Sequence, residues 1–252
     1  MDRAIPISVQ RKRKMKKAGM WIGGFVVVMC IAAWVGTQMI TTLDKKTIII
    51  SDVDRPLVIK VASISSARIQ VYFIDNEDYF RRKQIYRDDD GTFFQDNGER
   101  AVFFARGVLE TVKKLRWAPD VIHCSGWITS VLPLYLKKAY KDDPIFAGSK
   151  VVLSLFDDVP AEALAPGFRD TILFGGVKSR DLPETEATDG TFLAKLAAQY
   201  SDGIILGSGA VNPELTAWCK GLGVPMLDYD PASIADGSYM DSYNAFYDQI
   251  LK

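Results

Sequence analysis

The sequence predicts an α/β domain built on a doubly wound, layered sheet and preceded by one transmembrane helix. Strand-like and helical segments alternate from Asp96 onward, which is typical of layered α/β domains. Apolar runs such as residues 150–156 (KVVLSLF) fit buried parallel strands. Before them, residues 18–40 carry no charge over 23 positions, and roughly 20 suffice for a helix to cross the hydrocarbon layer.

Composition allows a large core and argues against a nucleic-acid partner. Of the 252 residues, 48% are hydrophobic, and basic and acidic residues balance at 31 each. Cys30, Cys124 and Cys219 lie far apart without metal-ligand spacing, so we interpret them as small buried side chains.

Residues 18–40 are predicted to be a single membrane-spanning anchor behind a basic cytoplasmic tail, residues 1–17, which holds seven bases and one acid. A secretory signal peptide is the first alternative, but its apolar core is usually shorter and no Ala-x-Ala cleavage site follows. A buried helix of the globular domain is the second alternative, and the uncharged length argues against it. Residues 41–46 are predicted to be a short linker to a domain over residues 47–252.

Three β-rich runs open that domain: Thr47–Ser51, Leu57–Ala62 and Ile69–Ile74. Turns are expected at residues 54–56 and 65–66. Because the runs lie so close in sequence, we expect antiparallel hairpins.

The next elements follow from periodicity and capping signals. Asp96 is expected to cap a helix ending at Leu115. Asn212 is expected to cap a later helix, with Pro213 at its first position. That helix is expected to end at Gly221 or Gly223. The other expected elements are a long excursion with a small helix over 159–190, helices over 192–200 and 241–251, and strands over 203–206 and 224–227.

Residues 116–140 are predicted to form a strand, a sharp turn and a helix beginning at Trp127. In open α/β sheets, ligands bind at the carboxyl ends of the strands. His123, the single histidine, lies at such an end, and Asp157-Asp158 follow the next strand.

Two short patterns have both a chemical and a structural interpretation. Asp88-Asp89-Asp90 suggests a metal site, but it lacks the alternating ligands of a calcium loop, and we favour a solvated turn. Gly207-Ser208-Gly209 could cradle an anion, and again we favour a plain turn. Nucleotide-loop, zinc-protease and nucleophile-elbow motifs do not occur, so no cofactor and no metal is expected.

Five segments, taken in order, resemble the amino-terminal catalytic domain of bacterial starch and glycogen synthases. They are VYFIDNEDYF (71–80), FQDNGERAVFFARGVLE (94–110), PDVIHCSGWITSVLPLYLKK (119–138), KVVLSLFDD (150–158) and TFLAKLAAQYSDGIILGS (191–208). The resemblance is strongest to short, single-domain forms from Bacteroidetes-type bacteria. It implies one Rossmann-like half of a glycosyltransferase-B-type fold.

The chain departs from the family where the family holds its substrate. The family's first strand and Lys-x-Gly-Gly-Leu phosphate loop have no counterpart, and the predicted membrane segment stands in their place. Ser125 and Gly126 replace a histidine and an aspartate, Asp157-Asp158 replace histidine-asparagine, and the second domain is missing.

The resemblance implies that His123 is catalytic and that Asp96, Asn97, Arg100 and Trp127 bind substrate. Three of these residues also have a structural interpretation. His123 can be a satisfied histidine at a strand end, Asp96 a helix cap, and Trp127 a core side chain.

The implied function is glucosyl transfer from ADP-glucose, as donor substrate, to an α-1,4-glucan by an incomplete domain or one that depends on a partner protein. The alternative is a catalytically inactive, membrane-anchored module that binds a glucan or a protein. The positive-inside rule places the domain outside the membrane, whereas the family's glycogen synthesis is cytoplasmic, so the side stays open.

Overall fold

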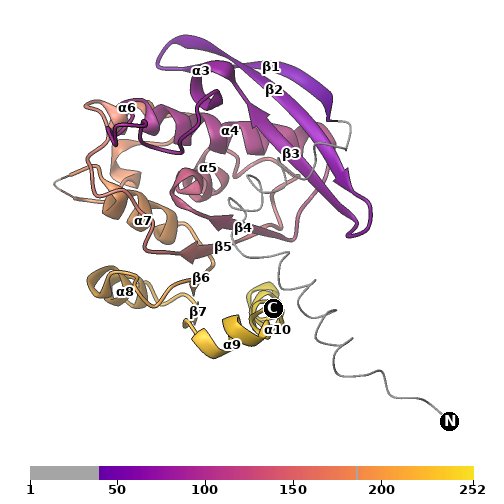
Figure 1. The fold of residues 1–252 in the computed structure, drawn as a ribbon, viewed down its shortest axis with the longest axis vertical. Coiled ribbons are helices and arrows are strands. Elements are labelled where there is room, and N and C mark those ends of the chain that lie inside the picture. Colours follow the sequence, from indigo (N-terminus) through magenta and orange to yellow (C-terminus); the bar gives the residue numbers. More distant parts are fainter. Residues whose placement is uncertain (1–39, 186) are drawn as a thin grey trace.

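The computed structural model describes residues 40–252 except residue 186 (Figure 1). The predicted basic tail, and all but the last residue of the predicted anchor, lie outside this range. Within it, no helix combines the length and the apolar character that a membrane span requires.

A three-stranded antiparallel sheet comes first, in the order β1-β2-β3. Its strands are β1 (Thr41–Ile50), β2 (Val53–Ile64) and β3 (Ile69–Asp75). The predicted hairpin layer is therefore confirmed, but two of its boundaries were wrong. Residues 41–46, predicted as a linker, are part of β1, and residues 54–56, predicted as a turn, lie inside β2.

The chain reverses between β1 and β2 at Ser51 and Asp52, whose φ angles are 49° and 61°. Two positive φ values give the tight turn that matches the twist of a hairpin, usually formed by Asn-Gly. Ser51-Asp52 lacks the glycine of the usual Asn-Gly signal, and we predicted the turn at Pro56 instead.

A four-stranded parallel sheet forms the second layer of strands, in the order β4-β5-β6-β7. The strands are β4 (Val121–Ser125), β5 (Lys150–Leu155), β6 (Gly203–Leu206) and β7 (Met226–Leu227). All four were predicted, with ends that differ by one or two residues.

The helices lie between the sheets and beyond the parallel one (Figure 1). They are α3 (Glu77–Phe80), α4 (Asn97–Leu115), η2 (Trp127–Thr129), α5 (Leu132–Lys138), α6 (Phe168–Thr171), η3 (Ser179–Asp181), α7 (Gly190–Gln199), α8 (Pro213–Lys220), α9 (Pro231–Asp236) and α10 (Tyr239–Leu251). The continuous helix predicted from Trp127 is split into η2 and α5. Pro133, in the first turn of α5, lacks the N–H that a continuous helix would need.

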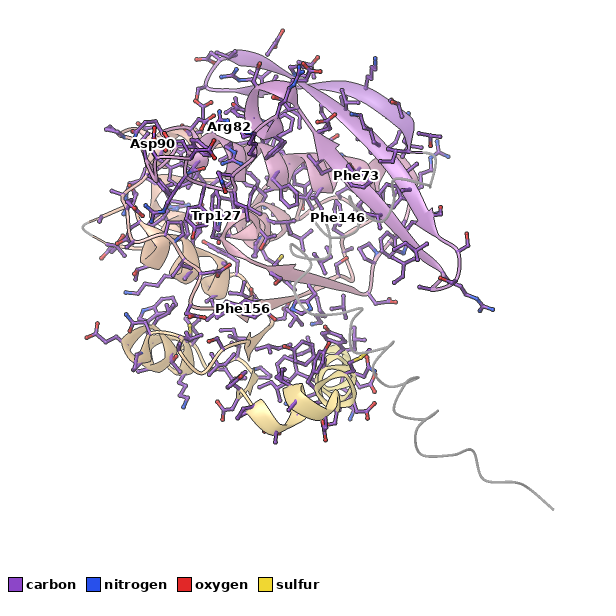
Figure 2. The ribbon with its side chains drawn as sticks, in the orientation of Figure 1. Phe73, Arg82, Asp90, Trp127, Phe146 and Phe156 are labelled. Atoms are coloured by element: carbon purple, nitrogen blue, oxygen red, sulfur yellow. The ribbon has the colours of Figure 1, made fainter. Side chains whose placement is uncertain are left out.

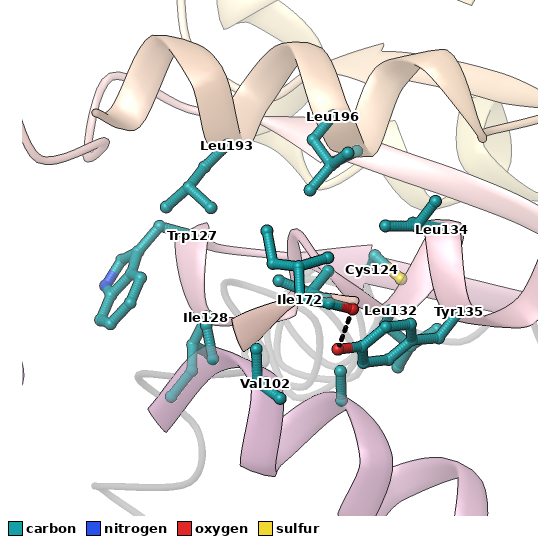
Figure 3. Close-up of a cluster of buried hydrophobic side chains, with 14 of the residues drawn as sticks. Val102, Cys124, Trp127, Ile128, Leu132, Leu134, Tyr135, Ile172, Leu193 and Leu196 are labelled. Carbon is teal, nitrogen blue, oxygen red and sulfur yellow. Dashed lines mark hydrogen bonds between the residues drawn. The ribbon is translucent and has the colours of Figure 1, made fainter. Parts of the chain in front are cut away.

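The main core fills the space around α4, α5 and α7, and Figure 3 shows part of it. A smaller core lies on the other face of the parallel sheet, where α10 covers β5 and β6; it contains Val152, Ile205, Phe246 and Ile250. Helices thus pack on both faces of the parallel sheet, which confirms the layered α/β arrangement; the described strands follow one another in chain order, without the reversal typical of a doubly wound sheet. At Gly107, α4 approaches the antiparallel sheet so closely that an added Cβ would lie 2.6 Å from Ile74 Cγ2.

Candidate functional site

The carboxyl ends of β4, β5 and β6 bring three turns to one edge of the parallel sheet. Gly126, with a φ of 80°, follows β4, and a Cβ on it would lie 4.0 Å from Asp158 Oδ2 in the turn after β5. A Cβ on Gly207, after β6, would lie 2.4 Å from the ring of Phe156 (Figure 2). Packing against Phe156 therefore explains Gly207 without an anion.

Asp158 is the carboxyl at this edge with the electrostatics of a proton-transfer group. Desolvation raises its pKa although the residue is exposed, a backbone hydrogen bond acts in the opposite direction, and the charge of Asp157 adds to the increase. Among the described residues, Asp158 forms no ion pair that would oppose this. A carboxyl of raised pKa beside a ligand-binding edge is a candidate general acid or base.

His123 points to the α10 face of the sheet, because side chains alternate along β4 and Cys124 faces the main core. Its Nε2 lies 2.7 Å from Ser154 Oγ, and its Nδ1 lies 2.8 Å from the hydroxyl of Tyr247. Burial lowers the pKa of His123 to about 4, so the ring is neutral at neutral pH. With both nitrogens bonded inside the protein, the geometry favours the structural interpretation; a catalytic role stays a prediction.

The partners of His123 were not found from the sequence. Tyr243 and Tyr247 of α10 lie edge-on to its ring, with centroid distances of 6.1 and 5.8 Å. Two signals were available. Ser154 interrupts an otherwise apolar strand, and Tyr239, Tyr243 and Tyr247 recur at the spacing of one helix face.

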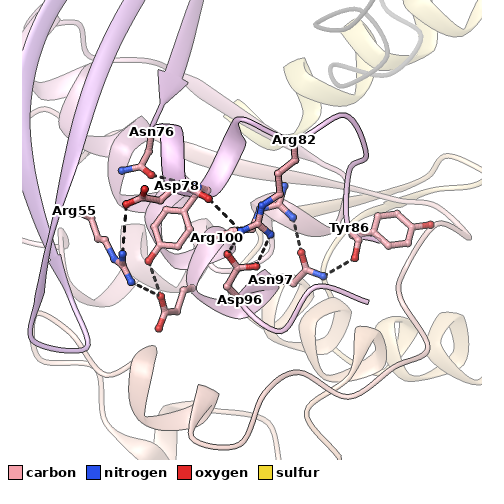
Figure 4. A network of polar contacts seen from close by, with 10 residues as sticks. Arg55, Asn76, Asp78, Arg82, Tyr86, Asp96, Asn97 and Arg100 are labelled. Atoms are coloured by element: carbon pink, nitrogen blue, oxygen red, sulfur yellow. Dashed lines mark hydrogen bonds and ion pairs between the residues drawn. The ribbon is translucent and has the colours of Figure 1, made fainter. Parts of the chain in front are cut away.

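Asp96 occupies the N-cap position of α4, but its side chain makes no capping hydrogen bond, so the predicted cap was wrong. The carboxylate instead forms a two-pronged ion pair with Arg82: Nη1 donates to Oδ1 at 2.7 Å and Nη2 donates to Oδ2. The Arg82 guanidinium also lies over the ring of Phe94. Asp96 therefore ties the segment after α3 to the start of α4 (Figure 4).

Asn97 and Arg100 continue this network in the interior (Figure 4). Asn97 Nδ2 donates to the carbonyl of Tyr86 at 2.9 Å, and its Oδ1 accepts from Arg100 Nη1 at 2.6 Å. The Arg100 guanidinium lies over the rings of Phe80 and Phe94, and its buried Nε has no partner. Burial lowers the pKa of Arg100 to about 10, which leaves it charged at neutral pH.

Trp127 is 3% exposed and packs edge-on against Tyr86, with ring centroids 6.1 Å apart. Its indole therefore belongs to the core, the structural alternative for this residue. The five predicted site residues thus fall into two groups: Asp96, Asn97, Arg100 and Trp127 lie on the α4 side of the parallel sheet, and His123 lies on the α10 side.

Replacing Arg100 is expected to separate packing from charge. Arg100→Ala should lower the free energy of unfolding by about 3 kcal/mol, because it opens a cavity between two rings and leaves Asn97 Oδ1 without its donor. Arg100→Met also leaves Asn97 Oδ1 without its donor, but it keeps the volume and removes a poorly compensated charge, so its cost should be only about 1 kcal/mol. Urea unfolding measures both, and equal losses would contradict this account.

The two short sequence patterns prove to be structural. Asp88 Oδ1 accepts hydrogen bonds from the backbone N–H groups of Asp90 and Thr92, which confirms the turn. Over residues 40–252 without residue 186, no cluster of three metal-ligating side chains occurs. Cys124 and Cys219 are buried free thiols, as predicted, and Cys30 lies outside the described residues.

Comparison with known proteins decides the family. The family model for the starch synthase catalytic domain matches residues 27–218. The chain belongs to the starch synthase catalytic domain family. The match begins inside the stretch that we predicted to be the membrane anchor.

Curated relatives of this starch synthase domain are longer proteins. The glycogen synthase of Chlorobium luteolum is 41% identical over 114 residues, which are 42% of this chain and 23% of that protein. The glycogen synthase of Clostridium perfringens is 34% identical over 142 residues, 56% of this chain and 25% of that protein. The chain thus spans about a quarter of the length of these relatives.

A solved structure shares the fold. The catalytic domain of starch synthase IV from Arabidopsis thaliana, bound to ADP and acarbose, superimposes with a TM-score of 0.58 at 14% identity. The match covers 75% of this chain and 40% of that one. The α/β glycosyltransferase-like architecture with a parallel sheet is thereby established.

Proposed function

We propose that this starch synthase domain is one half of a glycosyltransferase that moves a glucosyl group from ADP-glucose to an α-1,4-glucan. The observation that carries the proposal is the position of Asp158 beside Gly126, at the sheet edge where the resemblance places the substrate. Desolvation raises the pKa of Asp158, which is the direction that favours a proton-transfer role.

The edge cannot hold the leaving diphosphate by itself. Its turns contribute Ser125, Gly126, Asp157, Asp158, Gly207 and Ser208, which include two acids and no base. Transfer from ADP-glucose needs cations or backbone amides aimed at the diphosphate, and a second wall that positions the donor. We therefore propose that a partner protein supplies these elements.

The test is incorporation of labelled glucose from ADP-glucose into glycogen by the purified full chain, with and without a lysate of the source organism. Incorporation is expected only with the lysate. Asp158→Asn should reduce it by at least about 100-fold, because removing a proton-transfer group costs 10²–10⁴ in rate. Asp142→Asn is the matched control, because Asp142 is exposed and lies outside the edge. Absence of incorporation under every condition would refute the proposal.

A binding module without catalysis is the second candidate. It is favoured by the bonding of both His123 nitrogens and by the lack of any side chain at Gly126. Such a module would sediment with glycogen, or bind a protein partner, while transferring no glucose from ADP-glucose at any lysate concentration.

The membrane anchor over residues 18–40 also stays a proposal. Its uncharged length and the basic residues before it support it, whereas the family match beginning at residue 27 requires no membrane. If the anchor exists, the full chain resists alkaline extraction from membranes and a chain lacking residues 1–40 does not. The activity of a reporter fused after Lys252 would show on which side of the membrane the domain lies.

A further inference from the structure

We infer that a groove between the β1–β2 turn, α4 and α6 is a second carbohydrate site, which holds a neutral oligosaccharide such as a segment of α-glucan. The identity of the sugar rests on the proposed function; the site itself does not. The groove has a volume of about 840 Å³, within the range of small-molecule sites. It shares no residue with the sheet edge that carries Asp158.

Arg106 and Phe174 form the floor of the groove. The Arg106 guanidinium stacks on the Phe174 ring, with 3.8 Å from Cζ to the ring centroid, and donates one hydrogen bond to the carbonyl of Ile49. Among the described residues, no carboxylate forms an ion pair with Arg106. Most of its N–H groups are therefore available to donate hydrogen bonds to a ligand. Ile49 is 56% exposed at the rim and adds apolar surface on which a sugar ring can pack.

Hydrogen-bond acceptors lie on both sides of the groove, on the β1–β2 turn and on α6. Asp52 on the hairpin turn and Asp170 on α6 are exposed carboxylates that form no ion pair within the described part of the chain. The hydroxyls of Ser51 and Thr171 lie 3.4 Å apart and connect the two walls. Each sugar hydroxyl both donates and accepts, so a groove with a guanidinium, carboxylates and hydroxyls above an apolar floor matches an oligosaccharide.

The charge of the groove disfavours anionic ligands. Asp52 and Asp170 set two unpaired carboxylates against the guanidinium of Arg106, so a nucleotide or a sugar phosphate would be repelled. Glu99 is already engaged by Arg55 and by the Tyr79 hydroxyl. A basic peptide is the competing occupant, and the guanidinium on the floor opposes it.

The backbone conformation of Asp52 permits a substitution that tests its role in the groove. Asp52 adopts a φ of 61° that glycine would adopt with less strain, yet the chain has a carboxylate at this position. Asp52→Gly should therefore raise Tm by about 2 °C while removing one acceptor from the groove. A substitution that stabilises the fold and weakens binding cannot be explained by misfolding.

The experiment measures binding of maltoheptaose to the full chain by calorimetry, with hexalysine as the competing probe. Asp52→Gly and Asp170→Asn are each expected to weaken maltoheptaose binding about 5-fold, the loss of roughly one hydrogen bond. Asp142→Asn should leave it unchanged, because Asp142 is exposed and lines neither the groove nor the sheet edge. Unchanged binding in both groove variants, or binding of hexalysine but not of maltoheptaose, would overturn the inference.

The same variants separate this inference from the proposed function. If the groove holds glucan but the chain is no transferase, maltoheptaose binding responds to Asp52 and Asp170 while glucose incorporation is absent. If the transferase is real and the groove is not, incorporation responds to Asp158 while binding ignores both groove carboxylates.

Discussion

Lowering the pH from 7 to 4 is expected to reduce the free energy of unfolding by about 3 kcal/mol through His123 alone. Burial lowers its pKa in the native state to about 4, from an ordinary value of 6.5. Between these two pKa values the unfolded chain binds a proton at His123 and the native protein does not. The free energy of unfolding therefore falls as the pH falls through this window. Below about pH 4 both states bind the proton and the loss is complete.

Among the residues that the structure describes, no charged group faces the ring to compensate for its protonation. Its neighbours are Ser154 on the adjacent strand β5 and Tyr243 and Tyr247 on α10. Burial raises the pKa of Tyr247 to about 12 and also raises that of Tyr243. All three are neutral at acid pH. A protonated His123 would therefore lose an acceptor nitrogen and gain no counter-charge.

Urea unfolding between pH 7 and pH 4 of the wild type and of His123→Gln measures this effect. Carboxylates elsewhere titrate in both proteins, so the difference between the two curves isolates His123 and should change by about 3 kcal/mol across the window. Parallel curves would show that His123 titrates normally. That result would favour the catalytic interpretation, which needs an accessible ring.

Tyr135→Ala is expected to lower the free energy of unfolding by about 4 kcal/mol, among the largest losses available to a single substitution in this chain. Tyr135 is 0% exposed, packs edge-on against Phe174 at 5.8 Å, and donates from its hydroxyl to the carbonyl of Ile172 at 3.0 Å (Figure 3). Truncation would leave a ring-sized cavity and a buried carbonyl without its donor.

Tyr135→Phe is the matched control. It keeps the ring and removes only the hydroxyl, so its cost should be about 1 kcal/mol. Chemical denaturation of both variants gives the comparison. A Tyr135→Ala loss below that of Tyr135→Phe would mean that the α6 segment is not held by this ring. Because Phe174 forms the groove floor, the alanine variant should also weaken maltoheptaose binding.

The sequence by itself determined the elements whose signals are local. The apolar runs defined β4, β5 and β6. Asn212 caps α8 as predicted, with its Oδ1 accepting from the backbone N–H of Glu214 at 2.8 Å. Ordered segments also sufficed to indicate the starch synthase family. Periodicity, capping and apolar runs act over a few residues, so they can be recognised without knowing the fold.

Only the tertiary structure decided what the candidate site residues do. His123 forms a hydrogen bond with Tyr247, which lies 124 positions away. Asp96 forms an ion pair with Arg82 in place of the expected capping hydrogen bond. Asp158 reaches Gly126, and the groove joins three separate segments. The physical reason is that these roles depend on which face of a strand or helix is covered and by what, and such contacts form between residues far apart in the chain. The turn between β4 and η2 was located from the sequence; the partners of its residues were not.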